Sequence, residues 1–353
     1  MTGSKGLEAL SVPINKVNSR FHASSLLESI AFTRCWDVMS SVQRQLQLRD
    51  GSLMPAIGLG TWKSESNLVG QAVDAALEVG YRHLDCASIY GNEREIGEAT
   101  AQACRQHAIP RDELWITSKL WNDCHEPEHV RPALIRTLED LQLDFLDLYL
   151  IHWPVSHHHG IAVAQQASEQ IARNDLSLAD TWQAMEALVD EGLVGAIGVS
   201  NFSELKLSAL MQDARILPSV NQVERHPYLQ QPSLLSFCHQ HKIVLTAYSP
   251  LGSGGHGSTN LLHDPVIQAI GADHDCSPAQ VLLAWGLAQD TVVIPKSVKP
   301  ERLQSNLDAA FIKLREEDLV KIKHLDRNLR FNGGEIWILE GGDYTIANLW
   351  DAS

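Results

Sequence analysis

The sequence contains no long apolar run, few cysteines and little positive charge. No uninterrupted apolar stretch approaches the roughly 20 residues of a membrane-spanning helix, so a membrane protein is not expected. The 28 Lys and Arg against 43 Asp and Glu give a net charge of −15, which argues against nucleic acid or an anionic membrane as the main partner. Six cysteines without a CxxC pair or framework spacing favour reduced thiols in a cytoplasmic protein. These are Cys35, Cys86, Cys104, Cys124, Cys238 and Cys276.

The 353 residues are 44% apolar and 20% charged, which is ordinary for a soluble globular chain of one large or two medium domains. Residues 1–38 are Ser-rich and show no sustained hydrophobic period. They are interpreted as a disordered extension, or as residues upstream of a start at Met39. A transit peptide is a weaker alternative because of their three acids, and a signal peptide is disfavoured because no adequate apolar core follows the basic residues. We expect residues 39–353 to form a single domain.

Strand and helix patterns alternate from residue 56 onward. The clearest unit has strands over 114–121 and 145–153, with an amphipathic helix over 130–143 between them. Further strands are predicted at 56–60, 81–87, 195–200, 219–223, 243–248 and 291–295, and further helices at 66–78, 93–105, 179–190, 204–213, 232–240, 279–288, 300–309 and 316–325. Eight such units over about 290 residues predict an α/β fold, a (β/α)8 TIM barrel. On periodicity alone, a doubly wound open sheet is the alternative.

The ends of this pattern carry irregular or antiparallel segments. Residues 45–48 and 53–55 flank Asp50-Gly51, a strong hairpin pattern that would plug the bottom of the barrel. The connection 154–176 and the tail after Arg330 are long and irregular, and loops of that length in a compact domain are usually functional.

Polar residues follow successive predicted strands at the end where barrel enzymes place their chemistry. Asp85 and Tyr90 follow one strand, Lys119 ends the next, and His152 ends the one after that. Singly, each has a structural explanation: a packing tyrosine, a buried ion pair between Asp85 and Lys119, and a satisfied core histidine. A lysine within a run of Leu, Ile and Trp needs a partner to be buried, so their joint placement favours an active site.

These motifs resemble the aldo-keto reductases. The similarity lies in residues 80–90, 118–121 and 150–154, followed in the same order by 198–202, 221–224, 247–252 and 294–297, and in a tail ending Asn348-Leu349-Trp350. It covers residues 45–306 and implies the barrel fold and the Asp85, Tyr90, Lys119 and His152 tetrad. A carbonyl that accepts hydride develops negative charge on its oxygen, so the site needs a proton donor and polarising groups. In this interpretation Tyr90 is the acid, Lys119 eases its proton release, Asp85 pairs with Lys119, and His152 orients the carbonyl.

Three tryptophans also stand at strand ends. Each alone could be a core residue, but together they predict an aromatic-lined pocket for an apolar carbonyl substrate. The resemblance implies a substrate pocket formed by Trp62, Tyr90, Trp121, His152 and Trp153.

The resemblance also implies a nicotinamide cofactor. Tyr248 would stack on the nicotinamide, and Ser200, Asn201 and Gln222 would bond its carboxamide. Lys296, Lys299 and Arg302 place three cations in seven residues before a predicted helix, where barrel phosphate sites commonly lie. This favours NADPH over NADH, with a solvated basic helix start as the alternative. The expected cofactor contacts are Thr61, Trp62, Asp85, Ser200, Asn201, Gln222, Tyr248, Ser249, Leu251, Ser253, Lys296, Ser297, Val298, Lys299, Arg302 and Asn306.

One position departs from the family pattern, since Ser305 stands where a glutamate often touches the adenine. Two other motifs could suggest a different binding site. Residues 252–257 fit GxGxxG, but no helix opens from them, so they are interpreted as a flexible loop over the pyrophosphate. His157, His158 and His159 are consecutive, and consecutive positions rarely converge on one ion; no Cys or carboxylate is expected to join them, so no metal site is predicted.

The sequence therefore predicts a monomeric, cytoplasmic, NADPH-dependent reductase of aldehydes or ketones, with a small-molecule carbonyl as its partner. Two alternatives stay open. One is a cofactor-bound regulatory protein on the same fold, as the potassium-channel β subunits of this superfamily illustrate. The other is a reductase specific for a pentose or another sugar, or for a keto acid or diketogluconate.

Overall fold

The computed structural model describes residues 44–65, 67–252 and 260–351, which belong to the larger of two units of the chain, Gln43–Ser353. The predicted extension at 1–38 and Ser253 lie outside the described residues. Eight parallel strands pair in sequence order, each with the next along the chain. They are β3 (Leu59–Gly60), β4 (His83–Asp85), β5 (Trp115–Leu120), β6 (Leu146–Ile151), β7 (Val194–Ser200), β8 (Val220–Glu224), β9 (Val244–Tyr248) and β10 (Thr291–Val293).

The sheet closes on itself between its first and last strands. Ile57 forms a parallel bridge with Val293, and the backbone N–H of Gly58 donates to the Val293 carbonyl at 2.9 Å. Just beyond, the N–H of Gly60 donates to the Pro295 carbonyl at 3.1 Å. The (β/α)8 barrel prediction is confirmed, and the open-sheet alternative is wrong.

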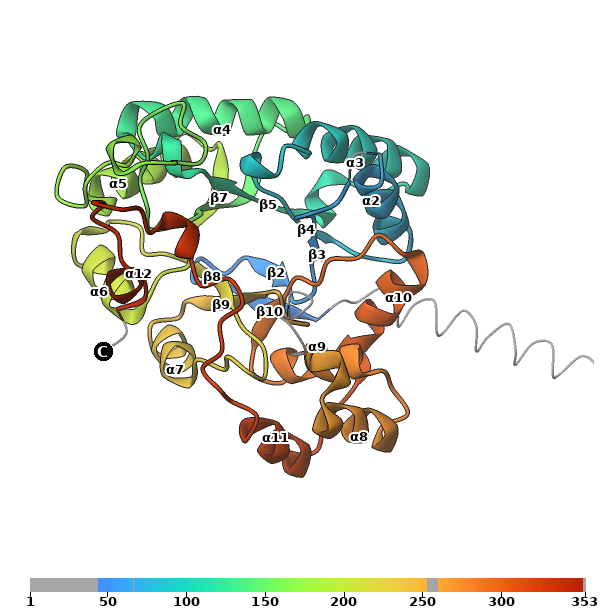
Figure 1. Cartoon of the computed structure of the whole chain (residues 1–353). Helices are drawn as coiled ribbons and strands as arrows, with labels where there is room; N and C mark the ends of the chain where they lie inside the picture. Colours follow the sequence, from blue (N-terminus) through green and yellow to red (C-terminus); the bar gives the residue numbers. More distant parts are fainter. Residues whose placement is uncertain (1–43, 66, 253–259, 352–353) are drawn as a thin grey trace, which may run out of the picture. The chain divides into compact units, whose positions relative to one another are not determined.

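Helices follow the strands and surround the barrel (Figure 1). They are α2 (Val69–Glu78), α3 (Glu93–His107), α4 (Pro127–Leu141), α5 (Leu178–Asp190), α6 (Glu204–Asp213), α7 (Pro232–Gln240), α8 (Pro265–Asp273), α9 (Pro278–Leu287), α10 (Pro300–Asp308), α11 (Glu316–Lys323) and α12 (Ile346–Trp350). Several begin with proline at the first turn, where its missing N–H costs nothing. Of the helices in the described ranges, none has the length and apolar character needed to span a bilayer.

The predicted N-terminal hairpin is present and packs as a plug. Strands β1 (Gln45–Gln47) and β2 (Leu53–Pro55) pair antiparallel across a turn in which Gly51 has a φ of 93°, a conformation that glycine adopts without strain. Leu48 and Met54 are buried in one apolar cluster with Leu148 and Val220, which belong to barrel strands. The barrel interior is therefore a packed core at the hairpin end, and the opposite end is left for a cavity.

Most predicted elements agree with the structure to within a few residues, and two helices were not predicted. Helix α8 starts after Asp264, whose carboxylate accepts hydrogen bonds from the backbone N–H groups of Val266 and Ile267. Helix α12 lies in the tail that was expected to be irregular. The connection 154–176 contains no strand and only a short 3-10 turn at Ala167–Glu169, as expected.

Candidate active site

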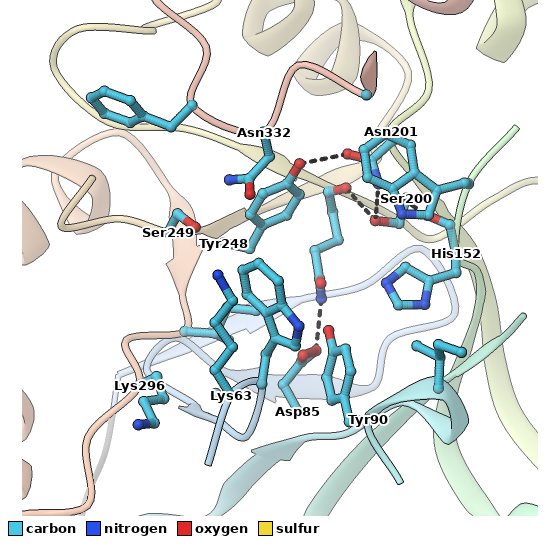
Figure 2. Close-up of a pocket in the computed structure, with 18 of the residues that line it drawn as sticks. Lys63, Asp85, Tyr90, His152, Ser200, Asn201, Tyr248, Ser249, Lys296 and Asn332 are labelled. Atoms are coloured by element: carbon cyan, nitrogen blue, oxygen red, sulfur yellow. Dashed lines mark hydrogen bonds between the residues drawn. The ribbon is translucent and has the colours of Figure 1, made fainter. Parts of the chain in front are cut away.

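A cavity of about 730 Å³ opens at the carboxyl ends of the barrel strands. Of the residues predicted for the site, it is lined by Thr61, Trp62, Asp85, Tyr90, Trp121, His152, Trp153, Ser200, Asn201, Gln222, Tyr248, Ser249, Leu251 and Lys296. Figure 2 shows Asp85, Tyr90 and His152 pointing toward one space, with Tyr248 and Asn201 across from them. The structure thus brings most of the predicted site residues together.

Lys119 and Asp85 form a fully buried ion pair beneath the cavity. The Lys119 ammonium lies 2.6 Å from Asp85 Oδ2 and donates a second bond to the Cys86 carbonyl at 2.7 Å. Gln222 Nε2 donates to Asp85 Oδ1 at 2.8 Å, so both carboxylate oxygens are engaged. Burial lowers the pKa of Lys119, but Asp85 and Tyr90 raise it more, so the pKa of this lysine is raised overall. The lysine therefore remains a cation at neutral pH.

Tyr90 ends the 3-10 turn Ser88–Tyr90 that directly follows β4. Lys119 Nζ lies 5.3 Å from the centre of the Tyr90 ring, and the ring meets the His152 imidazole edge to face at 5.8 Å. Burial raises the pKa of Tyr90 to about 12, while the charge of Lys119 and a hydrogen bond from it act in the opposite direction. The phenol is accordingly protonated at neutral pH, as a proton donor must be, with a cation beside it to stabilise the phenolate.

His152 follows β6 and supplies a neutral imidazole. Burial, the charge of Lys119 and His125 lower the pKa of His152 well below its ordinary value. Its ring packs edge to face against Trp121 at 4.9 Å, and its Nδ1 is buried without a hydrogen-bond partner. Asn201 Nδ2 donates to the His152 carbonyl at 3.0 Å, which fixes the backbone of this residue. A neutral ring can donate one N–H toward a substrate oxygen.

Across the cavity, polar side chains from β7, β8 and β9 form a connected wall. Tyr248 donates its hydroxyl to Asn201 Oδ1 at 2.8 Å, and Ser200 donates to the Gln222 carbonyl at 2.8 Å. The contact between Tyr248 and Asn201 is drawn in Figure 2. Thr61 donates to the Asp85 carbonyl at 2.8 Å, which ties the end of the first strand to the second.

The predicted phosphate segment continues from the cavity along the chain. Lys296 lines the cavity, whereas Ser297, Val298, Lys299, Arg302 and Asn306 run on from it toward and into α10 and do not line it. Lys296, Lys299 and Arg302 are exposed to solvent. Helix α10 begins after Lys299 without a side-chain cap; Pro300 has no N–H and the Arg302 N–H donates to the Lys299 carbonyl at 3.0 Å, so an anion here would be held mainly by the three cations and the helix dipole.

The tail after Arg330, which was expected to be functional, supplies part of the cavity, although none of its residues was predicted for the substrate pocket. Trp337 lines it together with Phe331 and Ile336, and the Trp337 ring meets the predicted Trp121 and Trp153 at 5.7 and 5.5 Å. An aromatic-rich tail was visible in the sequence, but no periodic pattern placed it over the barrel. Trp62 is also at the mouth and is 41% exposed.

Glu224, at the end of β8, anchors this tail and was also missed. Its carboxylate accepts hydrogen bonds at 2.7 Å from the backbone N–H groups of both Phe331 and Asn332, and it contacts His226 Nε2 at 2.8 Å. Burial acts to raise the pKa of Glu224, but these hydrogen bonds and His226 lower it. An ionised acceptor for two backbone donors is a strong tether.

The two remaining sequence motifs have different outcomes. Most of the 252–257 motif lies outside the described residues. In the histidine run, His157 is buried while His158 and His159 are exposed. Contrary to the prediction, a Cys and a carboxylate do accompany the histidine run, because Asp123 and Cys124 lie beside His159. The five cysteines of the described ranges are free, as predicted.

A closed parallel barrel with a buried lysine–aspartate pair, a protonated tyrosine and a neutral histidine at one cavity defines a class of oxidoreductase acting on carbonyl groups. The comparisons agree. The model of the aldo/keto reductase family matches residues 56–327, and the chain belongs to this family. It is 53% identical to an aldo/keto reductase of Synechocystis over 311 residues, covering 86% of this chain and 95% of that protein.

Two further relatives support the assignment. The chain is 46% identical to the pig aldo-keto reductase family 1 member A1 over 291 residues, which is 80% of this chain and 90% of that protein. Among solved structures it resembles the aldose reductase of Schistosoma japonicum, with a TM-score of 0.78, 40% identity, and coverage of 84% of this chain and 96% of that one.

Proposed function

We propose that this protein reduces aldehydes or ketones to alcohols with NADPH, and that Tyr90 is the proton donor. The observation that carries the proposal is the contact of Tyr90, at the wall of the cavity, with the buried Lys119, whose pKa is raised by Asp85 and Tyr90. We also propose a monomer and a cytoplasmic setting, the latter supported by the free cysteines of the described ranges.

The residues present fit a nicotinamide cofactor. The wall formed by Ser200, Asn201, Gln222 and Tyr248 offers amide and hydroxyl groups and an aromatic ring inside the cavity, which are the groups that a carboxamide-bearing ring requires. From this wall the chain leads to three exposed cations and to an uncapped helix N-terminus. Such a place favours an additional phosphate, and hence NADPH over NADH.

When bound, the reduced nicotinamide supplies the hydride for the carbonyl carbon. The chain provides the rest. His152, held neutral, donates a hydrogen bond that orients the carbonyl oxygen. Tyr90 gives that oxygen its phenolic proton, and the Lys119 ammonium stabilises the phenolate that remains. Asp85 holds the ammonium in place at 2.6 Å.

The lining of the outer cavity favours apolar carbonyl substrates. Trp62, Trp121, Trp153, Phe331 and Trp337 provide aromatic faces there. A sugar or a keto acid would place hydroxyl or carboxylate groups against these faces. The intact tetrad favours an enzyme over a regulatory protein that only binds the cofactor.

Tyr90→Phe tests the proton donor. We expect NADPH oxidation with an aromatic aldehyde, an aldose and a diketone to fall by about 10² to 10⁴. Tyr228→Phe is the matched control. It removes a phenol hydroxyl that donates a hydrogen bond to Asp264 and does not line the cavity, so turnover should be retained. Wild-type turnover by Tyr90→Phe on all three substrates would show that another group is the acid.

The cofactor preference is tested at the basic segment. Replacing Lys296 or Arg302 with Ala should raise the Kd of NADPH at least tenfold and leave that of NADH nearly unchanged, because only NADPH carries the added phosphate. Lys313→Ala, outside the segment, is the control. Equal losses for both cofactors would contradict a phosphate-binding role.

A further inference from the structure

Asp123, Cys124 and His159 bring three metal-ligating groups together away from the cavity that binds substrate. One ligand atom from each lies within 4.8 Å of the other two. Cys124 Sγ is 3.4 Å from Asp123 Oδ1 and 4.0 Å from His159 Nδ1. Carboxylate, thiol and imidazole groups therefore converge from two segments that are 35 residues apart.

These separations match those of a tetrahedral site. With metal–sulfur bonds of about 2.3 Å and metal–nitrogen or metal–oxygen bonds of about 2.0–2.2 Å, neighbouring ligand atoms lie about 3.6 Å apart. The sulfur–oxygen distance of 3.4 Å and the sulfur–nitrogen distance of 4.0 Å lie on either side of this value, so shifts of a few tenths of an ångström in these side-chain atoms suffice. A mixed sulfur, nitrogen and oxygen set suits zinc and the similar divalent transition metals, and does not suit calcium or magnesium.

The fold holds both segments in place. Asp123 and Cys124 belong to the 3-10 turn Asn122–Cys124, which follows β5. The Asn122 carbonyl accepts a hydrogen bond from the backbone N–H of His157 at 2.8 Å, and the Asp123 carbonyl lies 3.0 Å from His159 Nδ1. The histidine loop is thus docked on the turn before any ion arrives, and the ring must exchange its carbonyl contact for the ion.

The surroundings suit a half-open site. Cys124 is buried, while His159 is exposed, so an ion can enter from solvent. The His129 ring stacks on the His159 ring at 3.7 Å and fixes its plane, and His129 Nε2 lies 3.8 Å from Glu126. Arg136 points a guanidinium N–H at Cys124 Sγ from 3.9 Å, but burial and Asp123 outweigh it and raise the pKa of Cys124 to about 12, so an ion must displace the thiol proton.

We propose that Asp123, Cys124 and His159 bind one zinc-class divalent ion, with water in the fourth position. On binding, Cys124 gives its thiol proton to solvent and its sulfur bonds the metal, while His159 bonds through a ring nitrogen that carries no proton. The ion would tie the loop 157–159 to the end of β5. The same connection reaches the substrate cavity, where Trp121 Nε1 donates to the Ala162 carbonyl at 2.5 Å and Val163 lines the wall.

The test is titration of the purified, chelator-treated full chain with Co²⁺ and Zn²⁺. We expect one equivalent of Co²⁺ with a sulfur-to-cobalt charge-transfer band, displacement by Zn²⁺, and a rise in Tm with Zn²⁺. Cys124→Ser should abolish the band. His159→Ala and Asp123→Asn should each raise the Zn²⁺ Kd by more than about tenfold.

Matched controls keep the result specific. His158→Ala removes the neighbouring exposed imidazole, and Cys104→Ser removes a thiol elsewhere, so both should bind as the wild type does. The exposed His159 tolerates substitution even if Cys124→Ser fails to fold. Absence of stoichiometric binding, or binding that His159→Ala and Cys124→Ser leave unchanged, would overturn the proposal. Catalysis is not the readout, so this outcome is independent of the reductase proposal.

Discussion

The floor and the rim of the cavity are built differently. The floor consists of Asp85, Lys119 and His152, which end or directly follow neighbouring parallel strands and are 2%, 0% and 7% exposed. The rim is the tail segment 331–337, which lies over the cavity and is held by side chains such as Glu224. The floor takes its geometry from the barrel, whereas the rim takes its geometry from a few tethers. We therefore propose that the sheet fixes the chemistry and that the tail segment, which can vary without loss of the fold, sets substrate choice.

The largest expected effect is that of Lys119→Met, which tests whether the floor is held by the ion pair. It should abolish turnover and lower the free energy of unfolding by about 3–5 kcal/mol, because Asp85 is left as an unpaired buried charge. Urea unfolding and NADPH oxidation measure the two effects. Adding Asp85→Asn should recover much of the stability without activity. A single variant as stable as the wild type would show that the floor is not held by this pair.

A second test lies between β5 and the helices α3 and α4, at Glu93. Burial raises the pKa of Glu93 to about 7, and hydrogen bonds from Ser118 and Thr137 only partly offset this. Because its pKa is higher in the folded state, Glu93 contributes stability below about pH 4.5 that is lost as the pH rises through about 7.

Glu93→Gln isolates this contribution from the opposite effect of the buried histidines. The difference in unfolding free energy between wild type and Glu93→Gln should change by roughly 3 kcal/mol at most between these pH values. Glu98→Gln, on the same helix, is the control. Parallel pH profiles for wild type and Glu93→Gln would contradict a protonated Glu93.

The rim should respond to Glu224→Gln with a smaller and different effect. The neutral amide weakens the acceptor for the N–H groups of Phe331 and Asn332, at a cost of about 1.5–3 kcal/mol. We expect KM for an aromatic aldehyde to rise more than kcat falls, because the floor is untouched. Glu139→Gln, an exposed change on α4, serves for comparison. A fall in kcat with KM unchanged would show that the tail contributes to the chemical step, contrary to the proposed division between floor and rim.

The smallest expected effect is that of Ile336→Ala. Ile336 lines the cavity but is 57% exposed, so the free energy of unfolding should change by only about 0.5 kcal/mol. The KM for apolar aldehydes should rise severalfold at constant kcat, through lost apolar contact. Unchanged KM values for a series of apolar aldehydes would remove Ile336 from the substrate surface.

The predictability of the site follows the same division. Asp85, Lys119 and His152 could be predicted to meet because the carboxyl ends of all strands in a parallel barrel lie at the same end of the barrel, whatever the conformation of the loops. Trp337 could not be placed, since no period relates the tail to the barrel. Glu224 ends a strand as well, yet its role depends on backbone N–H groups more than 100 residues away. The Asp264-Pro265 start of α8 was visible, and its helix was overlooked.

The hairpin plug has a consequence for the order of events in turnover. With Leu48 and Met54 packed into the opposite end of the barrel, cofactor and substrate would have to enter through the same opening of the cavity. Of the groups proposed to hold the nicotinamide, Ser200, Asn201 and Gln222 are buried, whereas Trp62 at the mouth is 41% exposed. A substrate already seated among the tryptophans would obstruct the arriving nicotinamide, so the cofactor should enter first and leave last.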